Sequence, residues 1–256
     1  DNLYGGSAAD LILAGAGEDN VYAGGGADWV FGEDGDDFIS GDDGHDLLVG
    51  GAGLDRVEGG DGDDTLVVIN TSFGEAYSDA PIGSGGTGGS YNGGDGSDEI
   101  IVVKDDDEGA VTIKLTDNSI QLNALDVETL NSIEFAYLEG GDGQEADGSG
   151  DLIDASKFSG DAILIGNGAD DELIGGGGDD ILSGGTGDNL LTGNTGDDTY
   201  ILDVGAQGND VVEHIGEGVD VINLEAVTSD LDLVVSADPN IDHTVGLHDG
   251  ATFGDF

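Results

Sequence analysis

The sequence predicts an all-β fold, a flattened parallel solenoid wound from nine-residue units, and two regularities carry this prediction. From Gly5 to Val67 the chain reads as seven tandem units: GGSAADLIL, AGAGEDNVY, AGGGADWVF, GEDGDDFIS, GDDGHDLLV, GGAGLDRVE and GGDGDDTLV. Position six of every unit is Asp, and position eight is always Ile, Val or Leu.

Each unit predicts one turn followed by one short strand. The last three positions alternate, so the side chain at position eight faces one side of the strand. The first six positions are rich in Gly, which tolerates the positive φ of tight turns. Two units would make one coil, with position-eight side chains meeting inside and position-six carboxylates stacked along the turn edges.

The same pattern returns twice further along the chain. One unit, GGDGSDEII, occupies 93–101, and a second block from Gly166 to Ile201 reads GNGADDELI, GGGGDDILS, GGTGDNLLT and GNTGDDTYI. We therefore expect a first roll over 1–70, a Gly/Ser-rich linker over 71–92, and a β-rich segment of degenerate rungs over 93–150. A second roll over 151–205 and a divergent β-rich region over 206–256 would follow.

The stacked carboxylates predict bound cations. Turns on one edge would repeat about every 4.8 Å, as neighbouring strands do. Two carboxylates at about 5 Å repel by roughly 1 kcal/mol in water and roughly 3 kcal/mol at an effective dielectric of 20. A divalent cation would remove this repulsion. Oxygen-only ligands on flexible glycine turns favour Ca²⁺ over zinc, copper or magnesium.

Composition excludes several classes of partner and activity. The net charge of −53, from 57 acidic and 4 basic residues, argues against nucleic acid and anionic membranes. The chain has no Cys and no apolar stretch that approaches the length of a membrane span. It contains neither the metalloprotease motif H-E-x-x-H nor the nucleophile elbow G-x-S-x-G. His243 and His248 lie close in sequence but are a weak candidate for a zinc site. We therefore expect no enzyme activity.

The units resemble the RTX, or haemolysin-type, calcium-binding nonapeptide family, whose signature is G-G-x-G-x-D-x-U-x. The resemblance implies a right-handed parallel β-roll that holds calcium between alternate turns. It also implies type I secretion of an unfolded chain that folds on meeting external calcium. The residues that match the ligand position are Asp1, Asp10, Asp19, Asp28, Asp37, Asp46, Asp55, Asp64, Asp98, Asp171, Asp180, Asn189 and Asp198.

Some positions depart from the signature. Asn189 keeps an oxygen but loses the charge, so its site should be weaker. Ala14, Ala23 and Glu33 replace glycines and could perturb their turns. The acids at position five are expected to face solvent and to contribute only a negative electrostatic field to the sites. They are Asp36, Asp63, Asp170, Asp179 and Asp197. The acidic string at 104–109 is expected to be a hairpin turn, and the divergent region offers Asp203, Asp210, Glu217 and Asp220 as further candidate ligands.

One outer face of the first roll is predicted to be apolar although the repeat leaves its positions free. Positions seven and nine of alternate units place Leu11, Leu13, Trp29, Phe31, Leu47 and Val49 on that face. Contiguous exposed apolar side chains usually mark a contact. This face is therefore a candidate surface for docking or self-association.

Three readings of function remain open on the sequence. The leading one is a calcium-folded RTX region of a larger secreted bacterial protein that acts as a structural module outside the cell. The second is a self-assembling filament or surface-layer subunit held by calcium and the apolar face. The third is a C-terminal region that follows an enzyme domain in a longer protein. The first residue falls on position six of a unit, so we expect repeats to precede it.

Overall fold

The computed structural model describes residues 1–70, 89–104, 110–122, 126–141, 149–202, 211–212, 218–223 and 246–247. In these ranges the regular secondary structure consists of β-strands, as the sequence predicts. The chain divides into two compact units. The first comprises Asp1–Asp107 and Thr112–Leu138, and the second comprises Glu108–Val111 and Glu139–Phe256.

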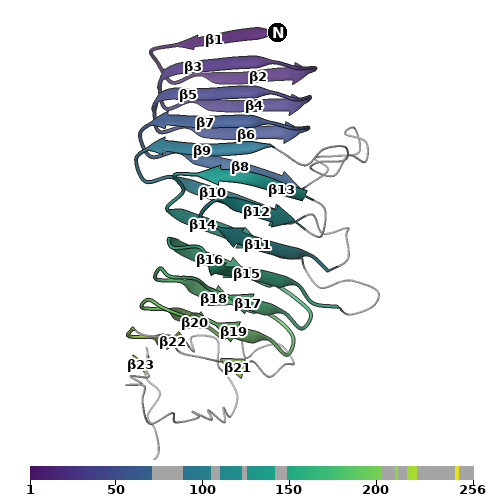
Figure 1. The fold of residues 1–256 in the computed structure, drawn as a ribbon, viewed down its shortest axis with the longest axis vertical. Coiled ribbons are helices and arrows are strands. Elements are labelled where there is room, and N and C mark those ends of the chain that lie inside the picture. Colours follow the sequence, from purple (N-terminus) through teal and green to yellow (C-terminus); the bar gives the residue numbers. More distant parts are fainter. Residues whose placement is uncertain are drawn as a thin grey trace, which may run out of the picture. The chain divides into compact units, whose positions relative to one another are not determined.

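From β1 to β10, consecutive strands of the first unit alternate between two sheets, which stack as coils of a parallel roll (Figure 1). One sheet has the order β1-β3-β5-β7-β9-β13-β12-β11 and the other has β2-β4-β6-β8-β10-β14. The rungs of the first sheet are β1 (Asn2–Gly6), β3 (Asn20–Gly26), β5 (Phe38–Gly44), β7 (Arg56–Asp61), β9 (Ser90–Asp95) and β13 (Asp126–Asn131). Those of the second are β2 (Leu11–Ala16), β4 (Trp29–Asp34), β6 (Leu47–Ala52), β8 (Thr65–Asn70), β10 (Glu99–Lys104) and β14 (Phe135–Glu139).

The register of these strands follows the nine-residue period. Val21 pairs with Leu3 and Ile39, each one coil of eighteen residues away. The position-eight side chains from Val21 to Leu66 have no exposed surface, so they form the core between the two sheets. The strands are longer than three residues because the first turn positions also pair, as Gly15 does with Glu33.

The segment after the first block contains an antiparallel hairpin that the sequence analysis did not predict. β11 (Thr112–Thr116) pairs antiparallel with β12 (Ser119–Leu122), and β12 pairs antiparallel with β13. Asp117 and Asn118 form the two-residue turn, a connection favoured in hairpins. β13 then returns to the parallel arrangement beside β9.

The second unit contains a second parallel roll with shorter strands. Its sheets have the orders β15-β17-β19-β21 and β16-β18-β20-β22-β23. Their strands are β15 (Leu152–Lys157), β16 (Asp161–Ile165), β17 (Glu172–Ile174), β18 (Ile181–Ser183), β19 (Leu190–Thr192), β20 (Thr199–Ile201), β21 (Val211–Val212), β22 (Val221–Asn223) and β23 (Gly246–Leu247). Leu173, Leu182, Leu191 and Tyr200 fill its core with no exposed surface.

The turns explain where the signature needs glycine. Positions two and four have positive φ in most units; for example, Gly60 has φ 123° and Gly62 has φ 129°. Non-glycine residues at position two adopt the smaller left-handed values that Asn and Asp tolerate, such as Asp42 at 67° and Asn194 at 74°. Glu33, which departs from the signature, has φ 73° and keeps the turn.

Candidate metal sites along the turn edges

The aspartates at position six form continuous ladders along the turns. The backbone N–H of each ladder residue donates a hydrogen bond to the Oδ1 atom of the aspartate one coil later. In the first unit these bonds are Asp10 to Asp28 (2.7 Å), Asp28 to Asp46 (2.8 Å), Asp46 to Asp64 (2.8 Å), Asp64 to Asp98 (2.9 Å), Asp19 to Asp37 (2.9 Å) and Asp37 to Asp55 (3.0 Å). In the second unit they are Asp151 to Asp171 (2.7 Å), Asp180 to Asp198 (3.0 Å) and Asp198 to Asp220 (3.0 Å).

The second carboxylate oxygen of most ladder residues is buried and lacks a hydrogen-bond partner among the described atoms. This holds for the Oδ2 atoms of Asp19, Asp28, Asp37, Asp46, Asp64, Asp98 and Asp198. A buried polar atom without a partner costs about 1–3 kcal/mol, and more when it carries charge. The ladders therefore leave a row of anionic oxygens that a cation could satisfy.

Backbone carbonyls converge on the same places. A Cβ built on Gly59, at position one, would lie 2.3 Å from Asp64 Oδ2 and 2.2 Å from the carbonyl oxygen of Gly93 in the next coil. The same two kinds of oxygen surround Gly32, where Asp37 Oδ2 and the Gly50 carbonyl would lie at 2.5 and 2.2 Å. In these units the glycine at position one thus leaves out a side chain where carboxylate and carbonyl oxygens meet.

This donor set fits calcium. Ca²⁺ takes six to eight oxygen ligands, including carboxylates and backbone carbonyls, in a flexible geometry. Within the described ranges, no group of three or more His, Asp or Glu side chains is arranged to hold a metal by itself. An ion at these edges would therefore be held jointly by position-six carboxylates and the carbonyls of successive turns.

Burial makes the charged form of the ladder carboxylates costly. It is the largest cause that raises the pKa of Asp64 and Asp180 to about 7, and that of Asp37 and Asp198 to about 6. Neighbouring carboxylates add to the rise, and the backbone hydrogen bonds oppose it. A bound cation would stabilise the ionised form and reverse this effect.

Three predicted ligands are placed differently from the rest. Asp1 is the most exposed, with 92% of its side-chain surface accessible, and its backbone nitrogen contacts Asp19 Oδ1. The Oδ2 atom of Asp180 already accepts a hydrogen bond from the Gly176 N–H at 2.6 Å. Asn189 accepts the Asp171 N–H through Oδ1, so the atom it presents beside Gly184 is its amide nitrogen, a donor that cannot bind a cation.

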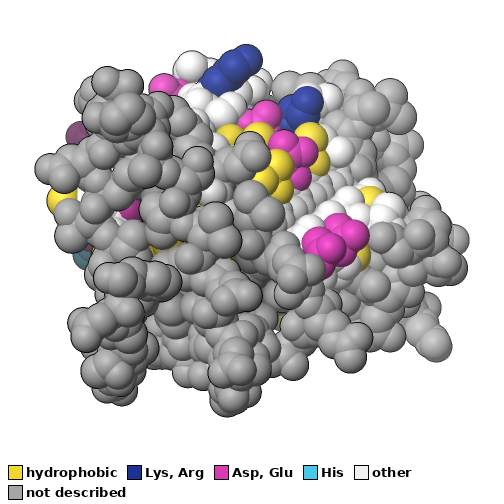
Figure 2. Space-filling model, turned by 90° about the horizontal axis from the view of Figure 1, so that it is seen from below, with side chains coloured by type: hydrophobic (Ala, Val, Ile, Leu, Met, Phe, Trp, Pro, Cys, Tyr) yellow, Lys and Arg dark blue, Asp and Glu magenta, His cyan; other side chains and the backbone are white. Residues whose placement is uncertain are grey.

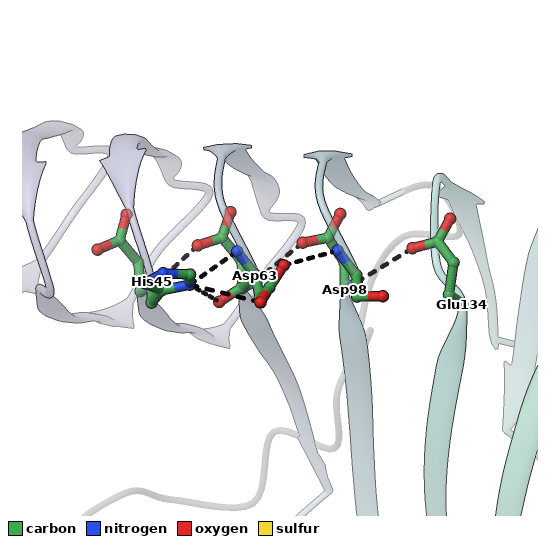
Figure 3. A network of polar contacts seen from close by, with 7 residues as sticks. His45, Asp63, Asp98 and Glu134 are labelled. Carbon is green, nitrogen blue, oxygen red and sulfur yellow. Dashed lines mark hydrogen bonds and ion pairs between the residues drawn. The ribbon is translucent and has the colours of Figure 1, made fainter.

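The structure adds members to the ladders that the nonapeptide pattern does not contain. Glu134 takes the position after Asp98, and its Oε2 atom accepts the Asp98 N–H at 3.0 Å (Figure 3). Asp151 accepts hydrogen bonds from the backbone N–H groups of Val111 and Gly141, both at 2.6 Å. Asp220, a candidate in the divergent region, accepts from Asp198.

The prediction that position-five acids contribute only their field is wrong. These side chains are exposed, but they form an outer ladder in the opposite direction, because each accepts the position-five N–H of the following coil. Asp36 accepts from Leu54 (2.9 Å), Asp63 from Ser97 (3.0 Å), Asp170 from Asp188 (2.8 Å), Asp179 from Asp197 (2.8 Å) and Asp197 from Val219 (2.7 Å). His45 takes the same role, since its Nδ1 atom accepts the Asp63 N–H at 2.9 Å (Figure 3).

Several predictions fall on residues outside the described ranges. These are residues 71–88 of the predicted linker 71–92, residues 105–109 of the predicted acidic turn 104–109, the candidate ligands Asp203, Asp210 and Glu217, and the pair His243 and His248. The predicted end of the linker at residue 92 is wrong, because β9 begins at Ser90 and pairs with β7.

The apolar face is present but narrower than predicted. Trp29 pairs with Leu11 and Leu47, and Phe31 with Leu13 and Val49, so the six residues do form two rows on one sheet. Leu11, Leu13 and Trp29 are 65%, 56% and 58% exposed, but Val49 is buried. Its row neighbours Phe31 and Val67 stand on the adjacent rungs, close enough to cover a small branched side chain.

On the face drawn in Figure 2, the basic side chains of the described residues lie beside acidic ones. No described segment forms a helix that is long and apolar enough to cross a membrane.

Fold and ladders together define a parallel β-roll whose turn edges present carboxylate oxygens to cations. A family model described as RTX calcium-binding nonapeptide repeat (4 copies) matches residues 1–30, 31–66, 158–191, 165–200 and 174–212. The chain therefore carries RTX calcium-binding nonapeptide repeats in two regions, as the motif analysis indicated, and these repeats imply calcium binding. A comparison with curated proteins found no match.

Proposed function

We propose that this calcium-binding β-roll region is a folding switch and structural module of a secreted protein. The buried second oxygens of the ladder aspartates are the observation that supports the proposal most strongly. Without calcium, these oxygens and a net charge of −53 oppose a compact state. With calcium, binding free energy becomes folding free energy.

The proposed compartment follows from the calcium concentration that such sites need. Extracellular calcium modules bind at about 10⁻⁴–10⁻³ M. Sites of this affinity are empty where calcium is scarce and filled outside the cell, so the chain would be exported unfolded, through the type I pathway implied by RTX repeats, and fold after export. This role requires no catalytic group, and we propose that the chain itself is not an enzyme.

Circular dichroism tests this function directly. The chain in chelator at neutral pH is expected to give a disordered spectrum, and millimolar calcium is expected to produce a β-sheet spectrum in a cooperative transition. Magnesium at the same concentration is the control and is expected to be much less effective, because it prefers a strict octahedral geometry. A strong β-sheet spectrum that survives chelation would contradict the proposal.

A self-assembling filament or surface-layer subunit is the second candidate, because Leu11, Leu13 and Trp29 are exposed side by side. Sedimentation velocity at millimolar calcium distinguishes the two functions. Assembly that is lost in Leu13→Gln, but kept in Tyr4→Gln on the other sheet, would favour the filament. A monomer in all three proteins would leave the structural module as the function.

A further inference from the structure

We propose that Glu134, which lies outside the nonapeptide units, joins Asp98 of the single unit at 93–101 in an additional divalent-cation site of the first unit. The family match ends at residue 66 and resumes at residue 158, so neither residue lies in a matched repeat. The inference rests on the proposed calcium binding and extends it to the irregular turn at 132–134.

The chain reaches this site through a shortened turn. β9 and β13 are parallel neighbours, with Asn92 paired to Asn131. From Asn92, six residues lead to the end of the turn at Asp98, whereas only the three residues 132–134 follow Asn131. Despite the difference in length, the Asp98 carbonyl accepts hydrogen bonds from the N–H groups of Glu134 and Phe135, both at 3.1 Å, so the two turns end side by side.

Glu134 supplies the carboxylate that the missing residues would have provided. The Asp98 N–H donates to Glu134 Oε2 at 3.0 Å, and the Asp64 N–H donates to Asp98 Oδ1 at 2.9 Å, so the same contact continues along the edge (Figure 3). Glutamate is one methylene longer than aspartate, which lets it span the same gap from a shorter turn. The ladder thus keeps its carboxylate spacing where the sequence pattern is lost.

The oxygens around this turn match those of a regular repeat. Asp98 is fully buried, and its Oδ2 atom has no hydrogen-bond partner among the described residues. A Cβ on Gly93 would lie 2.3 Å from that oxygen and 2.1 Å from the Ser132 carbonyl. At Gly59, in a regular unit, the corresponding distances are 2.3 and 2.2 Å. The Ser132 carbonyl therefore takes the place that the Gly93 carbonyl takes beside Gly59.

A contrasting turn shows that the open oxygen is a specific feature. In the second unit, the Oδ2 atom of Asp151 accepts the Gly141 N–H at 2.6 Å. A backbone N–H group therefore contacts the Oδ2 atom of Asp151, whereas the Oδ2 atom of Asp98 has no such partner among the described residues. A hard oxygen-preferring cation, with calcium as the expected ion, would bind Asp98, Glu134 and the Ser132 carbonyl.

The test uses the full chain and two charge-neutralising variants. Glu134→Gln keeps an oxygen that can accept the Asp98 N–H, and Asp98→Asn keeps the ladder as Asn189 does in the second unit. Asp95→Asn is the matched control, because Asp95 is an exposed carboxylate in the same coil. Bound calcium is counted by equilibrium dialysis. Hydrogen exchange of 129–138 is compared at two calcium concentrations that both leave the far-ultraviolet spectrum of the full chain unchanged.

The proposal predicts that each charge-neutralising variant binds one calcium ion fewer per chain than the wild type. The ratio of hydrogen-exchange protection in 129–138 between the two calcium concentrations is expected to fall at least about tenfold. The control variant is expected to match the wild type in both measurements. If Asp98→Asn fails to fold, Glu134→Gln alone decides the outcome. An unchanged ion count and unchanged protection in Glu134→Gln would overturn the additional site while leaving calcium binding by the repeats intact. A wild-type chain that binds no calcium would instead overturn the proposed function.

Discussion

The calcium-free chain is expected to regain β structure when the pH is lowered from about 8 to about 5. The pKa of Asp64 and Asp180 is raised to about 7 and that of Asp37 and Asp198 to about 6, mainly by burial. The folded state therefore binds more protons than the unfolded chain between the ordinary aspartate pKa of 3.8 and these values. The stability that the raised pKa values of these carboxylates contribute is fully present below about pH 4, and it is lost as the pH rises through 6 and 7.

The expected gain on acidification is on the order of 1 kcal/mol per ladder carboxylate, because solvent at the turn edges screens part of the cost. Far-ultraviolet circular dichroism in chelator measures it, and sedimentation at each pH separates folding from aggregation. Asp64→Asn is expected to fold better than wild type in chelator at about pH 8 and worse at limiting calcium. The exposed Asp61→Asn serves as the control. Equal behaviour of the two variants would contradict the account.

Gly62→Ala is expected to destabilise the calcium-loaded first roll by about 2–5 kcal/mol. Gly62 has φ 129°, which side chains rarely adopt, and a Cβ there would lie 1.6 Å from the carbonyl oxygen of Gly44 in the previous coil. That neighbour is backbone held in the sheet, so it cannot move aside cheaply. Denaturant unfolding at saturating calcium measures the loss.

Gly25→Ala is the matched control for this substitution. The nearest atom to a Cβ at Gly25 is the Asp43 carbonyl oxygen at 3.7 Å, an ordinary contact. The control is expected to change stability by less than about 1 kcal/mol, and a small gain would agree with the lower entropy of its unfolded chain. If Gly62→Ala costs no more than Gly25→Ala, the conformation described for position four is incorrect.

The repeat period made most of the roll predictable. Each nine-residue unit has an apolar residue at position eight and Asp or its substitute at position six. The apolar residues can be buried and the carboxylates stacked at the same time only when the coils stack in register. Val21, Ile39 and Val57 therefore lie in the core, and Asp19, Asp37 and Asp55 lie along one edge. The departures at Ala14, Ala23 and Glu33 did not break this register, because sheet pairing continues on both sides of them.

Other parts of the site depend on contacts that no local pattern encodes. Asp98 and Glu134 are 36 residues apart, twice the coil length, because a hairpin is inserted between their rungs. Only the position of Glu134 immediately before the strand-forming residues from Phe135 hinted at its role. The outer ladder was missed because an exposed acid next to an essential one looks redundant in sequence. Its hydrogen bond to the following coil becomes visible only when the coils are stacked.

Crystals grown in millimolar calcium, with anomalous data collected at long wavelength, would test the central claim most directly. The account predicts anomalous peaks about 2.3–2.6 Å from the Oδ2 atoms of Asp37, Asp46 and Asp64, with position-one carbonyls completing each site. The contradicting result would be an intact roll in which these oxygens are bonded to water or protons and no anomalous peak lies beside them.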